Sequence, residues 1–443
     1  MWKEKLFGVI SLGCDKNRVD TEKLIGLLKE RNCRLTDDLS RAQIVIVNTC
    51  GFLQSARAEA IDTILECADY KRDNLEKIVV TGCLPQKFIN ELYGPLKEAD
   101  VFLGISDYEK IFEALEKSYS ENQRQNFVGK GSDGYLRSRV ITTDPHYAYL
   151  KIADGCYNHC TYCLIPKIRG KYRSYPMEEL LREAEELGDL SELIVVAQDS
   201  TRYGEDLYGE NRFVELLQNL SKLDNIRKIR LLYCYPDAID DKLIEEIRSN
   251  GKILKYLDIP LQHSEDRVLK LMNRKGSRAQ YLELFKKLRE RIPDLAIRST
   301  FITGFPTETE EEFEKMKEFV EEAKLLNCGF FAYSREPDTG AFRLKPQVHH
   351  ATKKRREREL YETQMRISKQ LLSSYVGKQI QVVCDGIDYE KNCFIGRAYF
   401  NAPDIDGKVY FNAAEAMQGE EYTVTVLSAD SYDLYGKTED YLE

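Results

Sequence analysis

The sequence alternates short apolar runs with amphipathic helical patterns over most of its length, and this alternation constrains the fold more than any other feature. In residues 1–117 the apolar runs are LFGVISLG, IVIVNT, KIVVTG and VFLGI. We expect the helices between them to begin at about Asp20, at about Ser55 and near Pro85. Because parallel strands need long crossover connections, this order predicts an N-terminal α/β domain built on a parallel sheet.

A second series of strand and helix patterns follows a polar stretch with several glycines, residues 118–140, which we interpret as a linker. The strand-like runs of this series are YAYLKIA, ELIVVAQ, IRKIRLLY, YLDIPL, AIRSTFITG and CGFFAYS. Six consecutive units predict a partial, TIM-like (β/α)6 barrel. A charged amphipathic helix at residues 352–375 would leave this barrel, so we place the domain at residues 141–375.

The last segment, residues 376–443, changes character. Short β-type runs alternate here with Asp, Asn and Gly, which predicts a small all-β barrel of the OB kind. The segment has five Lys and Arg residues against thirteen Asp and Glu residues, so most of the chain's formal net charge of −9 lies here. Such a domain repels phosphates and attracts a basic protein. The same acidity also fits a domain that is merely kept soluble, which needs no partner.

The composition indicates a globular protein outside the membrane. The chain is 42% hydrophobic and 31% charged, and no apolar run approaches the roughly 20 residues that cross a bilayer. The N-terminal apolar stretch is too short for a signal peptide, so we expect a cytoplasmic protein. Thiols are kept reduced in that compartment, so the twelve cysteines favour metal or redox use over disulfides.

The strongest local motif is GCYNHCTYC, which places Cys156, Cys160 and Cys163 directly after the first strand of the second series. Three thiolates at this spacing hold three irons of a 4Fe–4S cluster and leave the fourth iron open. S-adenosylmethionine can bind an open iron and accept an electron into its sulfonium group. The alternative is a chance spacing, which the position after a strand disfavours. Tyr162 would pack over the cluster or be an ordinary loop aromatic.

A second set of cysteines is spread along the first domain. Cys14, Cys50 and Cys83 each follow an apolar strand and precede a helix. The carboxyl ends of parallel strands share one edge of the sheet, so we expect these thiols to meet there and to bind a second cluster with an open position. Three unrelated buried thiols are the alternative. We interpret the other cysteines as small core residues: Cys33, Cys67, Cys234, Cys328, Cys384 and Cys393.

The turn TGFPTET, with Gly304 and Glu308, follows the fifth barrel strand. Active sites of such barrels assemble at this face, so the turn is a candidate contact for the adenosyl group. It also fits a helix start, with Thr307 as N-cap and Glu310 three residues later, and the two interpretations are compatible. Four further polar residues end strands at this face and receive no catalytic role: Gln198, Asp199, Gln262 and His263.

The motifs together resemble the methylthiotransferase family of radical S-adenosylmethionine enzymes, and the resemblance spans the whole chain. The segments that carry it are SLGCDKNRVDTE, VNTCGF, TGCLPQ, ADGCYNHCTYCLIPKIRGKYRS, QDSTRYGEDLY, YLDIPLQH and ITGFPTET. The resemblance implies a cluster-binding domain, a radical SAM core domain and a TRAM domain, in this order. It also implies two 4Fe–4S clusters, one on each set of three cysteines.

Within this family LGCDKNRVD, QDSTRYGEDLY and LYCYP resemble the RimO type, which modifies an aspartate of the small-subunit ribosomal protein numbered twelve. Asp15 and Thr307 depart from the proline and glycine that are common there, without removing a ligand. The resemblance implies addition of a methylthio group to the β-carbon of that aspartate. One cluster would cleave S-adenosylmethionine and the other would serve sulfur insertion, with an electron donor and a basic ribosomal protein, free or on the small subunit, as partners.

Two other functions stay open at this point. A MiaB-type enzyme would perform the same chemistry on an adenosine of transfer RNA, but the acidic last domain makes direct RNA binding unexpected. An iron–sulfur electron-transfer or carrier protein would normally ligate its clusters fully, whereas each cysteine set here lacks a fourth ligand. A zinc module fits less well still, because structural zinc takes four ligands.

Overall fold

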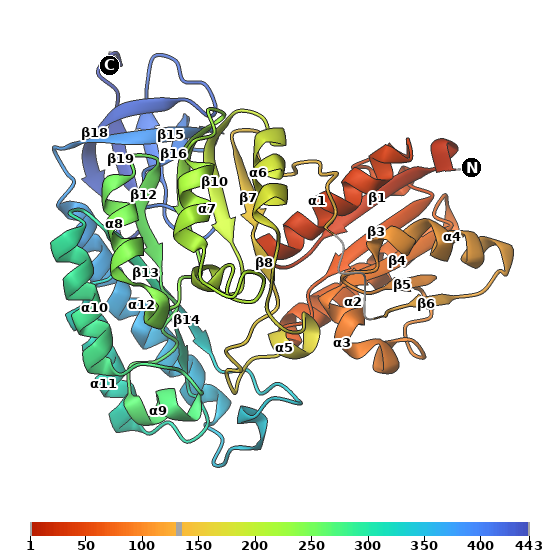
Figure 1. Cartoon of the computed structure of the whole chain (residues 1–443), viewed down its shortest axis with the longest axis horizontal. Helices are drawn as coiled ribbons and strands as arrows, with labels where there is room; N and C mark the ends of the chain where they lie inside the picture. The colour runs from red at the N-terminus through yellow and green to blue at the C-terminus, as the bar shows by residue number, and fades with distance from the viewer. Residues whose placement is uncertain (1, 130–134, 442–443) are drawn as a thin grey trace. The chain divides into compact units, whose positions relative to one another are not determined.

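The computed structural model describes residues 2–129 and 135–441 of the chain (Figure 1). Contacts within the chain group these residues into two compact units. Unit 1 comprises Met1–Thr142, Asp154–Tyr157 and Cys163–Tyr175. Unit 2 comprises Thr143–Ala153, Asn158–Tyr162 and Pro176–Glu443. Among the described residues, no helix has both the length and the apolar character needed to cross a membrane.

Unit 1 is built on a six-stranded parallel sheet with the order β2-β1-β3-β4-β5-β6. Its strands are β1 (Leu6–Ser11), β2 (Arg34–Leu35), β3 (Ile44–Thr49), β4 (Lys77–Gly82), β5 (Val101–Leu103) and β6 (Gln125–Phe127). Its helices are α1 (Asp15–Glu30), α2 (Gln54–Asp69), α3 (Cys83–Leu92), α4 (Ile111–Ser120) and the short α5 (Ile165–Ile168). The predicted parallel α/β fold is confirmed.

Both faces of this sheet are covered, which explains why its central strands are continuously apolar. Along β3, Ile44 and Ile46 point into a core with α1 and α4, while Val45 and Val47 point into a core with α2 and α3. Because successive side chains of a strand point to opposite faces, β3 contributes side chains to two separate cores.

The sequence misplaced two boundaries in unit 1. Helix α1 begins at Asp15 rather than at about Asp20, because Gly13, at φ +98°, turns the chain directly after β1. The predicted linker is wrong at its start, since α4 continues to Ser120 and the polar strand β6 pairs with β5. An edge strand of polar residues carries no alternating pattern that would reveal it. Residues 130–134, also within that prediction, lie outside the described residues.

Unit 2 contains a second six-stranded parallel sheet, with the order β14-β13-β12-β11-β10-β7. Its strands are β7 (Tyr147–Lys151), β10 (Leu190–Val196), β11 (Ile226–Leu231), β12 (Ile253–Asp258), β13 (Ala296–Thr303) and β14 (Asn327–Ala332). Its helices are α6 (Met177–Glu186), α7 (Phe213–Leu220), α8 (Asp241–Ser249), α9 (Asp266–Leu271), α10 (Arg278–Arg291), α11 (Glu310–Ala323) and α12 (His350–Ser373).

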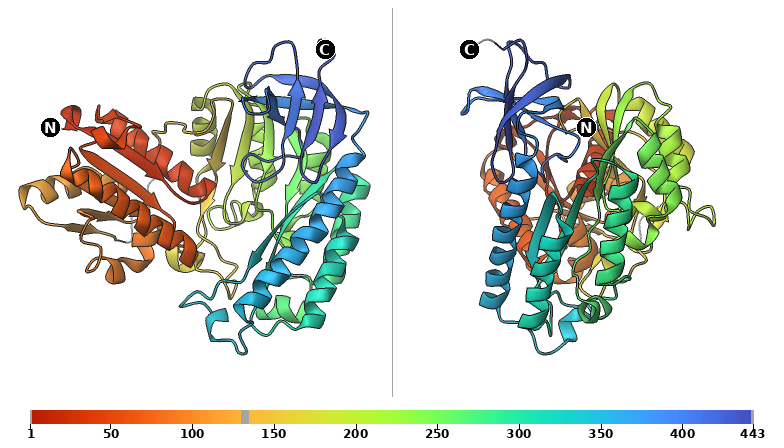
Figure 2. Two further views of the ribbon diagram at one scale, coloured as in Figure 1. Left: turned by 180° about the vertical axis from the view of Figure 1, so that it is seen from behind. Right: turned by 90° about the vertical axis from the view of Figure 1, so that its left-hand side faces the viewer.

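The sheet of unit 2 curves into the predicted partial barrel, with the longer helices along its outside (Figure 2). Helix α12 packs against β14 and α11 and leads out of the barrel, as expected of the charged C-terminal helix. A short ladder of β8 (Ala153–Asp154) and β9 (Arg173–Ser174) flanks the cysteine motif in the sequence, and Asp154 and β9 belong to unit 1.

The last residues of unit 2 form a closed five-stranded barrel with the order β15-β16-β17-β19-β18, which confirms the predicted small all-β fold. The strands are β15 (Gln379–Asp388), β16 (Cys393–Arg397), β17 (Val409–Asn412), β18 (Glu421–Ala429) and β19 (Leu434–Lys437). Closure of the barrel leaves no unpaired strand edge.

A buried ionic group joins this small barrel to the partial barrel. Glu192 of β10 accepts hydrogen bonds from Arg230 of β11 and from Arg397 of β16, the latter at 2.6 Å. Burial raises the pKa of Glu192, but the two guanidinium groups outweigh burial and lower it to about 2. The carboxylate therefore stays charged at neutral pH.

We predict that Glu192→Gln destabilises the protein by about 3–5 kcal/mol, because two buried guanidinium groups then face a neutral amide. Urea denaturation at neutral pH measures this loss. Glu420→Gln is the matched control, since the exposed Arg227–Glu420 pair also joins the two barrels but lies in solvent. Equal losses of stability in the two variants would contradict the stabilising role of the buried Glu192 ion pairs.

The lowered pKa of Glu192 also predicts that the stability of the protein depends on pH. A carboxylate with a lowered pKa stabilises the fold fully above its unfolded pKa, near 4.5, and this contribution is lost as pH falls toward 2. The wild type should thus approach the stability of the Glu192→Gln variant as the pH is lowered through this range.

Candidate metal centres

Three cysteines lie at the carboxyl edge of the sheet in unit 1. Cys14 follows β1, Cys50 follows β3, and Cys83 begins α3 directly after β4. These three strands are neighbours in the sheet, in the order β1-β3-β4. The fold therefore brings together three thiols that are far apart in the sequence, and their role as cluster ligands stays a prediction.

Glycines let the three cysteine loops approach one another closely. A Cβ atom on Gly13 would lie 2.9 Å from the Cβ atom of Cys50, and one on Gly51 would lie 2.8 Å from the carbonyl carbon of Cys83. Real Cβ atoms essentially never approach other heavy atoms below 3.0 Å. Any larger residue at these two positions would push the cysteine loops apart.

The environment of this trio disfavours free thiolates. Burial raises the pKa of the Cys83 thiol to about 12, and burial is also the main cause of the raised pKa of Cys50. Arg169 opposes both shifts. A metal that binds here must displace these protons, and in return it stabilises the deprotonated ligands.

An apolar shell surrounds the buried end of the trio. Cys83 packs with Ile105, with Leu164 and Ile168 from the α5 segment, and with Phe52 at its border. Such a shell limits water around a metal and lowers the local dielectric. The thiol set and its surroundings thus fit a soft iron–sulfur group.

The motif cysteines lie in one loop. Cys156 is buried and its N–H donates to the carbonyl of Gly170 at 3.2 Å, while the Cys163 Sγ accepts from the N–H of Ile165 at 3.4 Å. These contacts lie within unit 1. Cys160 belongs to unit 2. All three are free thiols, as a cluster site requires.

Cys160 has two neighbours that sequence reasoning missed. The hydroxyl of Tyr235 lies 3.6 Å from its Sγ atom, and Nη1 of Arg274 lies 3.9 Å from it. The Arg274 guanidinium also lies 4.2 Å from the centre of the Tyr235 ring. Tyr235 belongs to the quoted LYCYP segment, whereas Arg274 had no signal in the sequence.

The loop around Cys160 is anchored on both sides. Thr161 donates its backbone N–H to Met272 and its hydroxyl to Leu271, at 3.0 and 2.7 Å. Asn158 donates its amide to the Asp199 carboxylate at 2.8 Å. Asp199, which received no catalytic role from the sequence, thus helps to hold the cysteine loop.

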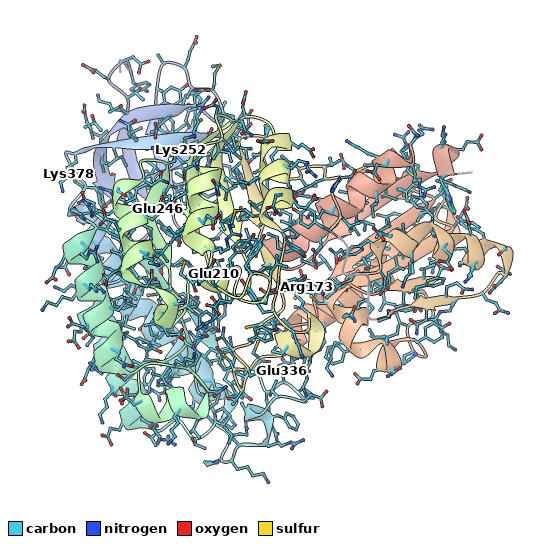
Figure 3. All side chains as sticks on the ribbon, viewed as in Figure 1. Arg173, Glu210, Glu246, Lys252, Glu336 and Lys378 are labelled. Carbon is cyan, nitrogen blue, oxygen red and sulfur yellow. The ribbon has the colours of Figure 1, made fainter. Side chains whose placement is uncertain are left out.

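Tyr162 packs in a cluster of unit 2 that contains Met272, Phe305 and Tyr333. Its proposed position over a cluster stays a prediction. Glu336 follows β14 at the same end of the barrel and is labelled in Figure 3. Its buried carboxylate accepts from the hydroxyl of Ser334 at 2.6 Å, and sequence reasoning missed it because a lone glutamate in a loop carries no pattern.

The carboxylate of Glu308 accepts hydrogen bonds from the backbone of its own turn and from a neighbouring helix. Its carboxylate accepts from the N–H groups of Gly304 and Phe305 at 3.0–3.3 Å, from Arg356 of α12 at 2.5 Å, and it lies 3.2 Å from Nε2 of His263. These bonds fix the shape of the turn. Contact of Gly304 and Glu308 with a cofactor stays a prediction.

The alternative helix start at this turn was placed two residues too early. The capping box of α11 is formed by Thr309 and Glu312, not by Thr307 and Glu310. Thr307 has φ +71°, a left-handed conformation that suits glycine and is incompatible with an N-cap.

Among the described residues, no three His, Cys, Asp or Glu side chains are placed to hold a single metal ion. A 4Fe–4S cluster has a different requirement, because each of three thiolates binds a different iron. Binding of a cluster by either trio stays a prediction.

We predict that Gly51→Ala removes most of the iron bound by the Cys14, Cys50 and Cys83 trio, because the new methyl group displaces the Cys83 backbone. Iron and sulfide content after anaerobic reconstitution measures this, in a background that lacks the three motif cysteines. Gly94→Ala is the control, since no atom lies within 4 Å of its added Cβ. Equal iron in both variants would refute the proposed packing requirement.

Comparisons with known proteins cover nearly the whole chain. Residues 6–104 match the uncharacterized protein family UPF0004, residues 150–320 the Radical SAM superfamily and residues 376–438 the TRAM domain. The ribosomal protein uS12 methylthiotransferase RimO of Thermoanaerobacter sp. (strain X514) is 44% identical over 440 residues, 98% of this chain and 100% of that protein. The one of Lachnoclostridium phytofermentans is 46% identical over 435 residues, 97% and 99% of the two chains.

Two solved structures share the fold at low sequence identity. The radical S-adenosylmethionine methyltransferase TsrM from Kitasatospora setae has a TM-score of 0.52 at 13% identity, covering 76% of this chain and 74% of its own. The cobalamin-dependent S-adenosylmethionine radical enzyme OxsB has a TM-score of 0.51 at 12% identity, covering 83% and 56%.

Proposed function

This chain belongs to the RimO family of ribosomal protein uS12 methylthiotransferases, and we propose that it performs the family's reaction with two cysteine trios of separate function. The observation that carries the family is the 43–46% identity with eight such enzymes over nearly the full length. It is accordingly a radical SAM methylthiotransferase of ribosomal protein uS12. This supports the ribosomal substrate over transfer RNA, and an enzyme over an electron carrier.

The proposal assigns one 4Fe–4S cluster to each trio, because both trios offer three thiols and no fourth. When bound, a cluster with an open iron supplies the electron that cleaves S-adenosylmethionine and so starts radical chemistry. Cys156, Cys160 and Cys163 would hold this cluster. A β-carbon C–H bond of aspartate is too weakly acidic for a side-chain base, which is why the reaction needs a radical.

The second trio would hold the cluster that takes part in sulfur insertion. Cys83 is buried in an apolar shell, whereas Cys14 is exposed. The exposed Cys14 would leave this side of the trio accessible to a sulfur source. The reaction needs reduced thiols and a ribosomal substrate, so the proposal places it in the cytoplasm.

We predict that Cys160→Ala abolishes S-adenosylmethionine cleavage, while Cys50→Ala retains cleavage and loses methylthio product. The reason is that each substitution removes a ligand of only one cluster. Chromatography of 5′-deoxyadenosine and mass spectrometry of the substrate measure the two steps. Cys393→Ala, which changes a half-buried cysteine of the small barrel, is the control. Methylthio product from the Cys50 variant would refute the division of labour.

The small barrel supports a basic protein as partner. Among its described residues seven acidic side chains are exposed, against three basic ones. The acidic residues are Glu390, Asp404, Glu415, Glu421, Asp430, Glu439 and Asp440. The basic residues are Lys378, Lys391 and Lys408. Such a surface attracts basic side chains and raises the rate of association at low salt.

We predict that the triple variant Glu390→Lys, Glu415→Lys and Glu421→Lys raises KM for uS12 by about tenfold at low salt, an effect of about 1.4 kcal/mol, and that salt weakens the effect. Cleavage of S-adenosylmethionine without substrate should be unchanged. The control is Glu283→Lys, an exposed residue on α10. An unchanged KM would show that the acidity serves only solubility, and a methylthio group on transfer RNA would favour the other substrate.

A further inference from the structure

Arg169 is a buried cation beside a candidate cluster ligand. Its side chain is 1% exposed, and Nη2 lies 3.5 Å from the Sγ atom of Cys83. The same nitrogen lies 3.0 Å from a carboxylate oxygen of Asp20 and 3.4 Å from Oδ1 of Asn17, while Nη1 lies 3.0 and 3.1 Å from the Asp154 carboxylate. All of these residues belong to unit 1.

The two carboxylates fix the direction of the guanidinium. Asp20 on α1 and Asp154 at the end of β8 hold its two terminal nitrogens, and both carboxylates are buried. A planar guanidinium held at two nitrogens cannot turn its remaining N–H away from the neighbouring sulfur. A lysine ammonium has no second nitrogen with which to repeat this arrangement.

Arg169 also ends the segment that carries the third motif cysteine. It follows α5 directly, and α5 follows Cys163 by one residue. Leu164 and Ile168 of this segment pack against Cys83. The apolar contacts of Leu164 and Ile168 and the hydrogen bond from Arg169 Nη2 to the Cys83 sulfur thus hold Arg169 beside Cys83.

We propose that Arg169 is a positioning residue that donates an N–H to the Cys83 thiolate and raises the reduction potential of the cluster on Cys14, Cys50 and Cys83. This inference rests on the proposed function of that trio. A reduced cluster carries one more negative charge, so a buried cation and an N–H donor at its sulfur stabilise the reduced form. Cys14, by contrast, is exposed.

Two variants distinguish the effect of the lost hydrogen bond on the potential from the effect of the lost charge. Asp20, Arg169 and Asp154 together carry a net charge of −1, whereas Arg169→Gln leaves −2. The double variant Asp154→Asn with Arg169→Gln restores −1 but lacks the N–H donor. A potential shift that persists in the double variant therefore reports the lost hydrogen bond rather than the lost charge.

The experiment is an EPR-monitored redox titration of the reconstituted protein, in which Cys156, Cys160 and Cys163 are Ala so that only one cluster is observed. At the midpoint potential of this parent protein, Arg169→Gln should lower the ratio of reduced to oxidised cluster by about tenfold, equal to 59 mV for one electron. The double variant should shift in the same direction by less. Lys167→Gln, which removes an exposed charge two residues away, should leave the midpoint unchanged.

A second measurement needs no variant of Arg169. Pulsed EPR of the reduced parent protein, grown with ¹⁵N-arginine, should show a nitrogen coupling through the N–H···S bond. Absence of this coupling would overturn the proposal, as would an unchanged midpoint in Arg169→Gln with full iron content. If the parent protein itself binds no cluster, the proposed function fails first, so the two failures are distinguishable.

Discussion

The parallel order of β1, β3 and β4 is the constraint on which the candidate site in unit 1 depends. Parallel pairing places the carboxyl ends of all three strands at one edge, and each strand is followed there by a cysteine. This pairing brings together residues that are more than thirty positions apart in the chain. Glycines beside Cys14 and Cys50 complete this arrangement, because the loops touch where those glycines lack a side chain.

The segment Cys163–Tyr175 links a motif cysteine to the surroundings of Cys83 within unit 1. The segment begins at Cys163. Its Leu164 and Ile168 pack against Cys83, and its Arg169 donates an N–H to the Cys83 sulfur. A guanidinium is costly to bury, and Arg169 remains buried because two carboxylates, those of Asp20 and Asp154, each lie 3.0 Å from it. The two ion pairs therefore hold the Arg169 guanidinium in a fixed position.

The sequence predicted the parts of the molecule that repeat a pattern. Both parallel sheets and the small barrel follow from alternation, and the convergence of the cysteines follows from strand order. Single side chains that act through a tertiary contact had no pattern to reveal them. Arg169 and Arg274 acquire their sulfur neighbours only in the fold. The cap of α11 lies at Thr309 because Thr307 adopts a left-handed conformation that its residue type does not suggest.

The raised thiol pKa values link metal binding to folding of unit 1. The fold buries Cys83 and partly buries Cys50, which stabilises neutral thiols and keeps both protonated at neutral pH without a cluster. A cluster held by Cys14, Cys50 and Cys83 would release those protons and put positive metal in their place. Because the same apolar residues that raise the pKa also exclude water from the bound group, the burial that opposes a free thiolate favours a thiolate that is bound to metal.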